Sequence, residues 1–222
     1  MWKSIAGVTR IGLSLTLIAS VGCGRSSNTQ PGEKATNPPP TRPADPSVTN
    51  AVGFHVLDFV AWNNRDMDVF RRYHTADVKV DMAGQHTEGI DAHVNAIEGT
   101  LKSMPDARIA QHSPIVAEGE WTCMVGVIVP MNLKMVTVAK WRDGAIAEEY
   151  IFMNLVKQGA APPTLSGVPI VNISNRRPEL RREIGAEPGW SCVFGTGVDG
   201  KRAVVLTKSK DGATAEDLVF VE

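Results

Sequence analysis

The sequence predicts an α+β fold in which helices pack on one face of a curved antiparallel sheet. Apolar residues recur at helical spacing over residues 52–60 and again over residues 90–104. Four strand-like runs then follow one another at residues 107–118, 121–130, 134–142 and 145–154. Asp143-Gly144 joins the last two runs, and this dipeptide is a strong hairpin signal, so neighbouring strands are expected to be antiparallel.

The remaining elements of this region follow in chain order. The first apolar stripe predicts a helix from about Val52, and a second short helix is expected over residues 66–70. Alternation of apolar residues over residues 78–82 predicts a strand, and residues 84–89 are interpreted as the turn after it. The long helix is expected to end before Pro105, because the residue that precedes a proline avoids the helical region.

The first 50 residues are expected to lie outside the fold. Lys3 and Arg10 come before an apolar run over residues 11–21, and small residues precede Cys23. Residues 1–22 are therefore interpreted as a secretory signal peptide. Cys23 at this place resembles the lipidated cysteine of bacterial lipoproteins. The alternatives are an ordinary signal peptide, with Cys23 a plain thiol, and a single transmembrane anchor, for which the run is shorter than the ~20 residues needed.

The lipoprotein resemblance implies a location in the bacterial cell envelope, with the chain held on a membrane through lipid. Residues 23–50 are rich in Pro, Ser, Thr and Asn and are expected to form a disordered linker behind that anchor. The formal net charge of −1 becomes −3 when Lys3 and Arg10 leave with the signal peptide. Nucleic-acid binding is excluded, because it requires a basic face.

Cysteine and histidine spacing carries little information here. Cys123 and Cys192 can pair in an oxidising compartment or remain as buried free thiols, and the sequence leaves both readings open. The chain has no CxxC motif and no Cys/His cluster with zinc spacing. Neither a metal ion nor another cofactor is therefore expected.

Five short segments occur in a recognisable order between residues 51 and 162. They are residues 62–66 with Tyr73-His74, 81–84, 104–108, 115–121 and 141–150. In this order they resemble the SnoaL-like polyketide cyclase family of the nuclear transport factor 2-like superfamily. The resemblance implies a cone, in which a bent sheet wraps around the N-terminal helices and encloses a pocket. The family includes cyclases, isomerases, dehydratases and members without known activity, so the fold alone does not assign a function.

The resemblance also implies a carboxylate near the end of the last strand of the sheet as the acid/base group. Asn154 occupies that position, and an amide cannot take up a proton at neutral pH. Strict alternation places Glu148, Tyr150, Phe152 and Asn154 on one face of the strand, which makes Glu148 the substitute base.

The predicted pocket lies between the long helix and the strands. We expect Trp62, Tyr150, Phe152 and Asn154 to line it as ligand-binding residues. His93, on the apolar face of the long helix, and His112, in the first long strand, are further catalytic candidates. Each of these histidines is also compatible with a structural role in the core or the pocket wall.

Two functions are compatible with these residues. The first is a membrane-tethered module that binds a small apolar ligand or a partner in the cone pocket, without cyclase activity. The alternative is an enzyme of the polyketide cyclase or isomerase type, which acts by acid/base chemistry on a small carbonyl compound. A homodimer is left open.

Residues 163–222 carry no family resemblance and are expected to form a small β-rich extension. Strands are predicted at residues 190–198, 203–208 and 218–221, and residues 175–184 are interpreted as a short helix or an irregular loop. Three short strands have too little area for an independent core. They are therefore expected to pack on the first domain or to extend its sheet.

Overall fold

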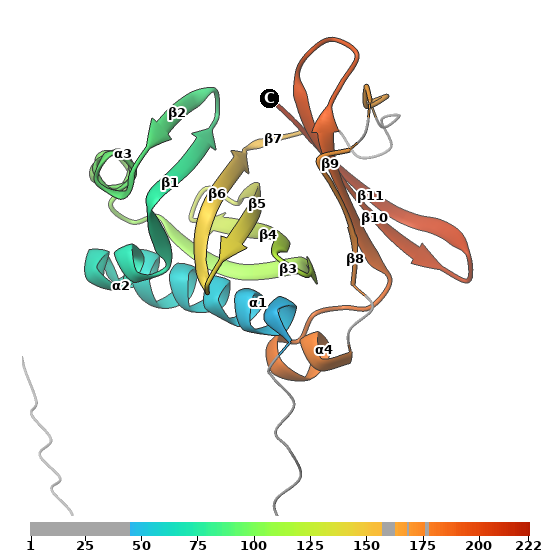
Figure 1. Cartoon of the computed structure of the whole chain (residues 1–222), viewed down its shortest axis with the longest axis horizontal. Helices are drawn as coiled ribbons and strands as arrows, with labels where there is room; N and C mark the ends of the chain where they lie inside the picture. The colour runs from blue at the N-terminus through green and yellow to red at the C-terminus, as the bar shows by residue number, and fades with distance from the viewer. Residues whose placement is uncertain (1–44, 157–162, 168, 176–177) are drawn as a thin grey trace, which may run out of the picture. The chain divides into compact units, whose positions relative to one another are not determined.

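The computed structural model describes residues 45–156, 163–167, 169–175 and 178–222 (Figure 1). These residues all belong to one unit of the chain, residues 42–222. The predicted signal peptide, Cys23 and the linker up to residue 44 lie outside the described residues. Within the described part, no helix combines the length and the apolar character needed to cross a bilayer.

The first helix, α1 (Pro46–Val56), begins earlier than residue 52, where the sequence analysis expected folding to start. The side chain of Asp45 caps the helix by accepting a hydrogen bond from the backbone N–H of Ser47, and proline occupies the first turn. Ser47 and Asn50 are buried, so residues 46–50 belong to the fold and not to the linker. Because residues 46–50 are mostly polar, the sequence analysis did not predict that a capped helix begins here.

Three further helical segments complete the helical side of the fold. A π-helical segment, η1 (Leu57–Trp62), continues directly from α1. The short α2 (Met67–Arg72) follows, capped by the carboxylate of Asp66, and α3 (Ile90–Ser103) matches the predicted long helix. The buried face of α3 consists of His93, Val94, Ile97 and Leu101.

Sheet A has six strands in the order β2-β1-β6-β5-β4-β3. The predicted run of four antiparallel strands is confirmed by β3 to β6, whereas β2 lies in the predicted turn. Residues 85–88 are polar and mostly exposed, so no alternating pattern marked β2. The strands are β1 (His74–Met82), β2 (Gln85–Glu88), β3 (Arg108–Glu118), β4 (Trp121–Val129), β5 (Leu133–Arg142) and β6 (Ala145–Phe152).

A β-bulge in β6 decides which side chains reach the helices. The register against β5 shifts between Ile146 and Glu148, which leaves Ala147 as an extra residue. One extra residue reverses the alternation of the strand beyond it. Ile146 packs in the core beneath the helices, and after the bulge the helix side passes to Glu149 and Ile151.

Sheet B is a second, antiparallel sheet with the order β7-β11-β10-β9-β8. The three strands predicted near the C-terminus correspond to β9, β10 and β11, and the chain passes from sheet A to sheet B at Met153, between β6 and β7. The helix α4 (Pro178–Ile184) lies between β8 and β9 in the chain. The strands are β7 (Asn154–Leu155), β8 (Val171–Ser174), β9 (Trp190–Thr196), β10 (Arg202–Lys210) and β11 (Ala213–Val221).

Sheet B packs on the face of sheet A that points away from the helices. One core cluster joins Val138 and Phe152 of sheet A to Phe194 and Phe220 of sheet B. The strands β3 to β6 of sheet A are therefore covered on both faces, and sheet B packs on sheet A without extending it. Figure 1 shows the two sheets with the helices of residues 46–103 on the other side of sheet A.

Two cysteines lie in the core between the sheets. Cys123 is on β4 and Cys192 is on β9, and both are buried and unbridged. Burial raises the pKa of the Cys123 thiol well above its ordinary value, and the neighbouring Cys192 adds to that shift. The sequence left open whether these two cysteines pair, and in the structure they are free thiols.

Candidate functional site

A narrow cavity of about 40 Å³ lies between the helices and sheet A. Its wall is mostly apolar, with a few polar side chains, and this composition is typical of small-molecule sites. The polar members are Asp58 from η1, His93 and Thr100 from α3, Thr137 from β5 and Glu149 from β6. Apolar members include Trp62, Met82, Ile97, Met104, Ile128 and Ile151.

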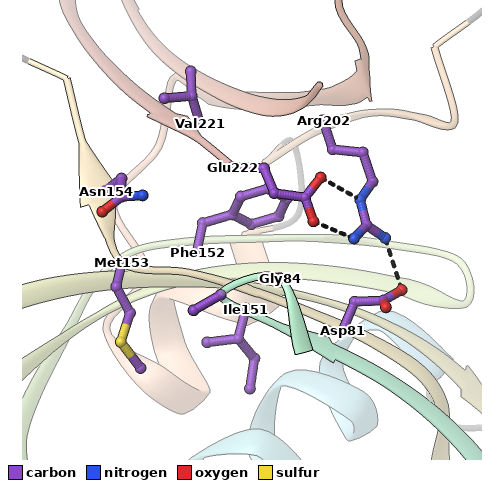
Figure 2. A pocket seen from close by; sticks show the side chains of 10 residues that line it. Asp81, Gly84, Ile151, Phe152, Met153, Asn154, Arg202, Val221 and Glu222 are labelled. Atoms are coloured by element: carbon purple, nitrogen blue, oxygen red, sulfur yellow. Dashed lines mark hydrogen bonds and ion pairs between the residues drawn. The ribbon is translucent and has the colours of Figure 1, made fainter. Parts of the chain in front are cut away.

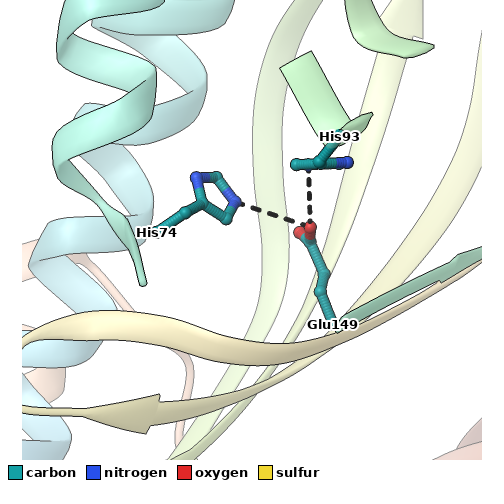
Figure 3. A group of neighbouring side chains, drawn as sticks. All are labelled: His74, His93 and Glu149. Carbon is teal, nitrogen blue, oxygen red and sulfur yellow. Dashed lines mark ion pairs between the residues drawn. The ribbon is translucent and has the colours of Figure 1, made fainter. Parts of the chain in front are cut away.

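Glu149 stands on one wall of this cavity beside two histidines (Figure 3). Its Oε2 atom lies 3.6 Å from Nε2 of His74 and 3.5 Å from Nε2 of His93. The side chains of His74, His93 and Glu149 are 0%, 2% and 6% exposed, respectively. Among the described residues, none of these three atoms has a hydrogen-bond partner. We call these residues the Glu149 cluster.

The tautomer of His74 is set by its other ring nitrogen. Nδ1 lies 2.9 Å from the carbonyl oxygen of Phe70, and because a carbonyl only accepts, Nδ1 must carry the proton. Nε2 of a neutral His74 then presents a lone pair to the carboxylate of Glu149. Two lone pairs that face each other repel, so the His74–Glu149 contact needs a positive charge between the two side chains.

The charges of this cluster follow from burial and from its neighbours. Burial by itself raises the pKa of Glu149, but His74 and His93 outweigh it and hold the pKa below its ordinary value. Burial lowers the pKa of His93 to about 4, although the negative Glu149 opposes this. At neutral pH the cluster therefore contains an ionised Glu149 and a neutral His93.

A second group of side chains also reaches the cavity, and we call it the Asp58 chain. Nε2 of His112 lies 2.7 Å from Oδ2 of Asp58, and Nδ1 of His112 lies 2.9 Å from Nδ1 of His55. Asp58 lines the cavity, the side chain of His112 is fully buried, and His55 is half-buried. The three side chains thus connect the cavity to the outside of α1. Asp58 lies in the π-helical segment, a feature that is frequent at functional sites.

The pKa of the carboxyl group in this chain is shifted in the opposite direction to the pKa of Glu149. Burial raises the pKa of Asp58, and its hydrogen bond with His112 offsets that only in part. Burial also lowers the pKa of His55 to about 4, with the charge of His112 adding to the shift. Two carboxylates on one cavity with pKa values moved apart are the pattern that separates acid and base roles in enzymes.

The structure brings some of the predicted site residues together at the cavity. Trp62 and His93 line it, and His112 reaches it through Asp58. Glu148 and Tyr150 lie on the other face of sheet A, where Tyr150 donates a 3.0 Å hydrogen bond to Glu148 and its ring packs against Phe194. Glu148, Tyr150 and Phe152 share a face of β6 as predicted, but that face turns to sheet B, so the predicted position of Glu148 as a base in this pocket is wrong. After the bulge at Ala147, the side that faces the helices belongs to Glu149 and Ile151.

Phe152 and Asn154 are also misplaced in the prediction, since they line a second pocket of about 120 Å³, which shares Ile151 and Met153 with the cavity (Figure 2). That pocket is dominated by Arg202, whose Nη1 lies 2.7 Å from Asp81 and whose Nε lies 3.0 Å from Glu222. Carboxylates engage the guanidinium from both sides, so Arg202 acts as an ionic link between the sheets. Asn154 is exposed on β7 and does not line the cavity that Glu149 lines.

Sequence reasoning missed the residues that hold the two clusters together. His74 was named only as part of the family resemblance, and none of His55, Asp58 and Glu149 was named as a site residue. A carboxylate at Asp58 in the middle of an apolar helical stripe was the available signal. Glu149 gave no such signal, because its side of the strand depends on the bulge.

Comparison with known proteins supports the resemblance described above. The SnoaL-like domain family matches residues 56–149 of this chain. The matched part of the chain contains α3, the strands β1 to β5 and Glu149 on β6, and it is similar to a SnoaL-like domain. No curated protein sequence matches the chain.

Several solved structures are similar to this chain at low identity. A SnoaL-like protein of unknown function from Burkholderia thailandensis is 14% identical, covers 46% of this chain and 92% of its own, and has a TM-score of 0.41. A candidate isomerase of the SnoaL-like family from Agrobacterium tumefaciens is 16% identical, with coverages of 49% and 97% and a TM-score of 0.42. IdmH, a candidate polyketide cyclase from Streptomyces antibioticus, is 16% identical, with coverages of 46% and 89% and a TM-score of 0.41.

Proposed function

We propose that this protein is an enzyme that transfers a proton on a small, mostly apolar carbonyl compound held in the cavity beneath α3. The observation that carries the proposal is the Asp58 chain. It places a carboxyl group of raised pKa on the wall of an apolar cavity and connects it through His112 to a half-buried histidine. The sequence favoured a binding module because it offered no catalytic pair, and Asp58 with His112 supplies one.

The chemistry assigned to Asp58 is removal of a proton from the carbon next to a carbonyl group. The carboxylate takes that proton, and the electron pair of the broken C–H bond forms an enolate. The enolate is then reprotonated by Asp58 or attacks a second carbonyl of the same molecule to form a ring. A carboxyl group works best in this role when its pKa lies near the operating pH, and burial moves Asp58 in that direction.

His112 and His55 are assigned to the supply and removal of protons. When Asp58 is ionised, Nε2 of His112 donates to it and Nδ1 of His112 accepts from His55. When Asp58 is protonated, it donates to Nε2 of His112, and Nδ1 of His112 donates to His55. Changing between these two arrangements moves one proton along the chain, so Asp58 can exchange protons with solvent while the cavity stays closed.

The test is hydrogen–deuterium exchange at carbons next to the carbonyl group of small cyclic ketones, followed by NMR in D₂O. We expect the wild type to accelerate exchange and Asp58→Asn to lose about 100-fold or more of that rate. Glu148→Gln is the matched control, because Glu148 lies on the other face of sheet A and its loss leaves the cavity intact. Ketone binding by the wild type without any exchange would contradict the enzyme and support the binding module.

The membrane tether through Cys23 is a separate part of the proposal, with the bacterial cell envelope as the location. Its support is the basic start, the apolar run and the small residues that precede Cys23. We expect Cys23→Ser to move the protein from the membrane fraction to the soluble fraction, because a membrane anchor of this kind depends on its acyl chains. A fully soluble wild type with an unmodified N-terminal peptide would contradict the tether.

A further inference from the structure

We propose that His74, His93 and Glu149 together bind one divalent transition-metal ion, and that Zn²⁺ is the ion their geometry fits best. The three ligand atoms lie within 4.8 Å of one another, although they come from β1, α3 and β6. Figure 3 shows both imidazole rings directed at the same carboxylate. No spacing motif marks this set in the sequence, because the fold assembles it from three separate elements.

The first argument is that these atoms are unsatisfied. Nε2 of His74, Nε2 of His93 and Oε2 of Glu149 are buried and have no hydrogen-bond partner within the described part of the chain. A buried polar atom without a partner costs free energy, and most such atoms in folded proteins are paired. Three of them directed at one point indicate a shared partner that is not a protein atom.

The second argument is the distance between the ligand atoms. The separations of 3.5 and 3.6 Å are too long for good hydrogen bonds between a ring nitrogen and a carboxylate. Two ligands held at about 2.0–2.1 Å from Zn²⁺ at the tetrahedral angle lie about 3.3–3.4 Å apart. Two ligands at right angles around Mg²⁺ at about 2.1 Å lie only about 3.0 Å apart. The observed separations are thus closest to tetrahedral zinc.

The third argument is the donor set and its orientation. Imidazole nitrogens suit zinc and other transition metals better than Mg²⁺ or Ca²⁺. Nδ1 of His74 donates to the carbonyl oxygen of Phe70, which fixes Nε2 as the lone-pair donor that a metal requires. The positive charge that the His74–Glu149 pair needs is supplied by the ion.

The place of the cluster leaves one side of the ion open. His93 and Glu149 both line the cavity, so a fourth coordination position faces the apolar space and not protein. Three protein ligands with one open position is the arrangement of catalytic zinc sites. An ion there would hold and polarise a carbonyl oxygen in the cavity that Asp58 also lines. This last role rests on the proposed function, whereas metal binding itself does not.

The experiment measures metal directly. The full chain is stripped with a chelator, refolded in the presence of Zn²⁺ or Co²⁺ and desalted, and its metal content is determined by mass spectrometry. Refolding with the ion removes the objection that a buried site fills slowly. We expect one ion per chain, a rise in melting temperature with Zn²⁺, and the strong visible absorption of tetrahedral Co²⁺.

Two variants and one control assign the ion to this site. Glu149→Gln keeps the shape of the side chain and removes its charge, and His93→Gln removes one nitrogen ligand, so both should lose stoichiometric metal. His86→Gln is the matched control, because His86 also contacts two carboxylates, Asp81 at 2.8 Å and Glu88 at 3.3 Å, but on the exposed side of sheet A. That variant should keep its metal.

The outcomes separate this inference from the proposed function. A refolded wild type that carries no more metal than Glu149→Gln overturns the metal site, and this comparison needs only soluble protein. Metal retained equally by wild type, Glu149→Gln and His93→Gln also overturns it. Ketone exchange that persists after chelation would leave the enzyme standing without the ion, whereas metal binding by an inactive wild type would leave the ion without the enzyme.

Discussion

The two histidine–carboxylate groups beside the cavity contain similar side chains but differ in how completely they are satisfied. In the Asp58 chain, neighbouring atoms lie 2.7 and 2.9 Å apart, which is hydrogen-bond distance. In the Glu149 cluster, the corresponding separations are 3.5 and 3.6 Å. The first group is complete within the protein and is suited to passing protons. The second leaves atoms for a bound ion, so similar composition serves different chemistry.

The largest effect is expected from a change that destroys both groups at once. Ile97 is 2% exposed on α3, beside His93 and against the cavity. Ile97→Asp places an unpaired charge in this core and should cost about 3–5 kcal/mol of unfolding free energy. Urea unfolding followed by circular dichroism measures it. Asn95→Asp adds the same charge on the exposed side of α3 and should have little effect; equal losses would mean that α3 does not face the core.

A smaller effect is expected from breaking only the Asp58 chain at its outer end. His55→Gln leaves Asp58 and His112 in place and should lower ketone exchange by about 10-fold, because it removes one proton-transfer group. Added imidazole buffer should restore part of the rate, which a purely structural defect would not allow. Metal content should not change. An unchanged exchange rate would show that Asp58 exchanges protons with solvent without His55.

The pH dependence of stability sharpens the same comparison. The pKa of His55 is lowered from 6.5 to about 4, so between these pH values the unfolded chain binds a proton at His55 that the folded chain does not bind. Stability is therefore expected to fall between pH 6.5 and about 4, and this contribution should level off below that range. Its titratable neighbours in the fold are His112 on β3 and, through it, Asp58 on η1.

The size of that contribution is modest, because His55 is only half-buried. After discounting for solvent screening, it should be on the order of 1 kcal/mol. Melting temperatures of wild type and His55→Gln across this pH range measure it, and the two curves should approach each other as the pH falls. Parallel curves would contradict the lowered pKa.

The smallest effect is expected on the face of sheet A that the cavity does not use. Tyr150→Phe removes the hydrogen bond to Glu148, which is partly exposed, and should change the unfolding free energy by about 0.5–1 kcal/mol. Ketone exchange and metal content should both stay at wild-type levels. A large loss of either would place Tyr150 at the cavity after all and contradict the bulge in β6.

The fold was largely predictable from the sequence, because its elements depend on local patterns. The amphipathic stripe ending before Pro105 located α3, and Asp143-Gly144 located the β5–β6 hairpin. The polar β2 escaped notice because it is an exposed edge strand with no alternation. The packing of sheet B on sheet A was one of two arrangements that the sequence left open, and the choice between them could not be made, since packing of one face on another leaves no spacing signal.

The candidate site was only partly predictable, for a different physical reason. Trp62, His93 and His112 were found because they stand on helix or strand faces that local periodicity resolves. The acidic partner was assigned to Glu148 and not to Glu149, because both faces of β6 are buried and alternation alone does not say which face turns to the helices. A single residue of register thus separated the predicted base from the carboxylate that lines the cavity.

The packing of sheet B has a consequence for how this protein can be divided. The family match ends at residue 149, inside β6, yet the chain continues through Met153 into a strand that pairs with the last strand, β11. A fragment that stops near residue 156 would leave Val138 and Phe152 facing water, as an apolar surface prone to self-association. The segment that can be transplanted or exchanged between proteins as a unit therefore extends to Val221. The boundary of homology and the boundary of autonomous folding lie about 70 residues apart in this chain.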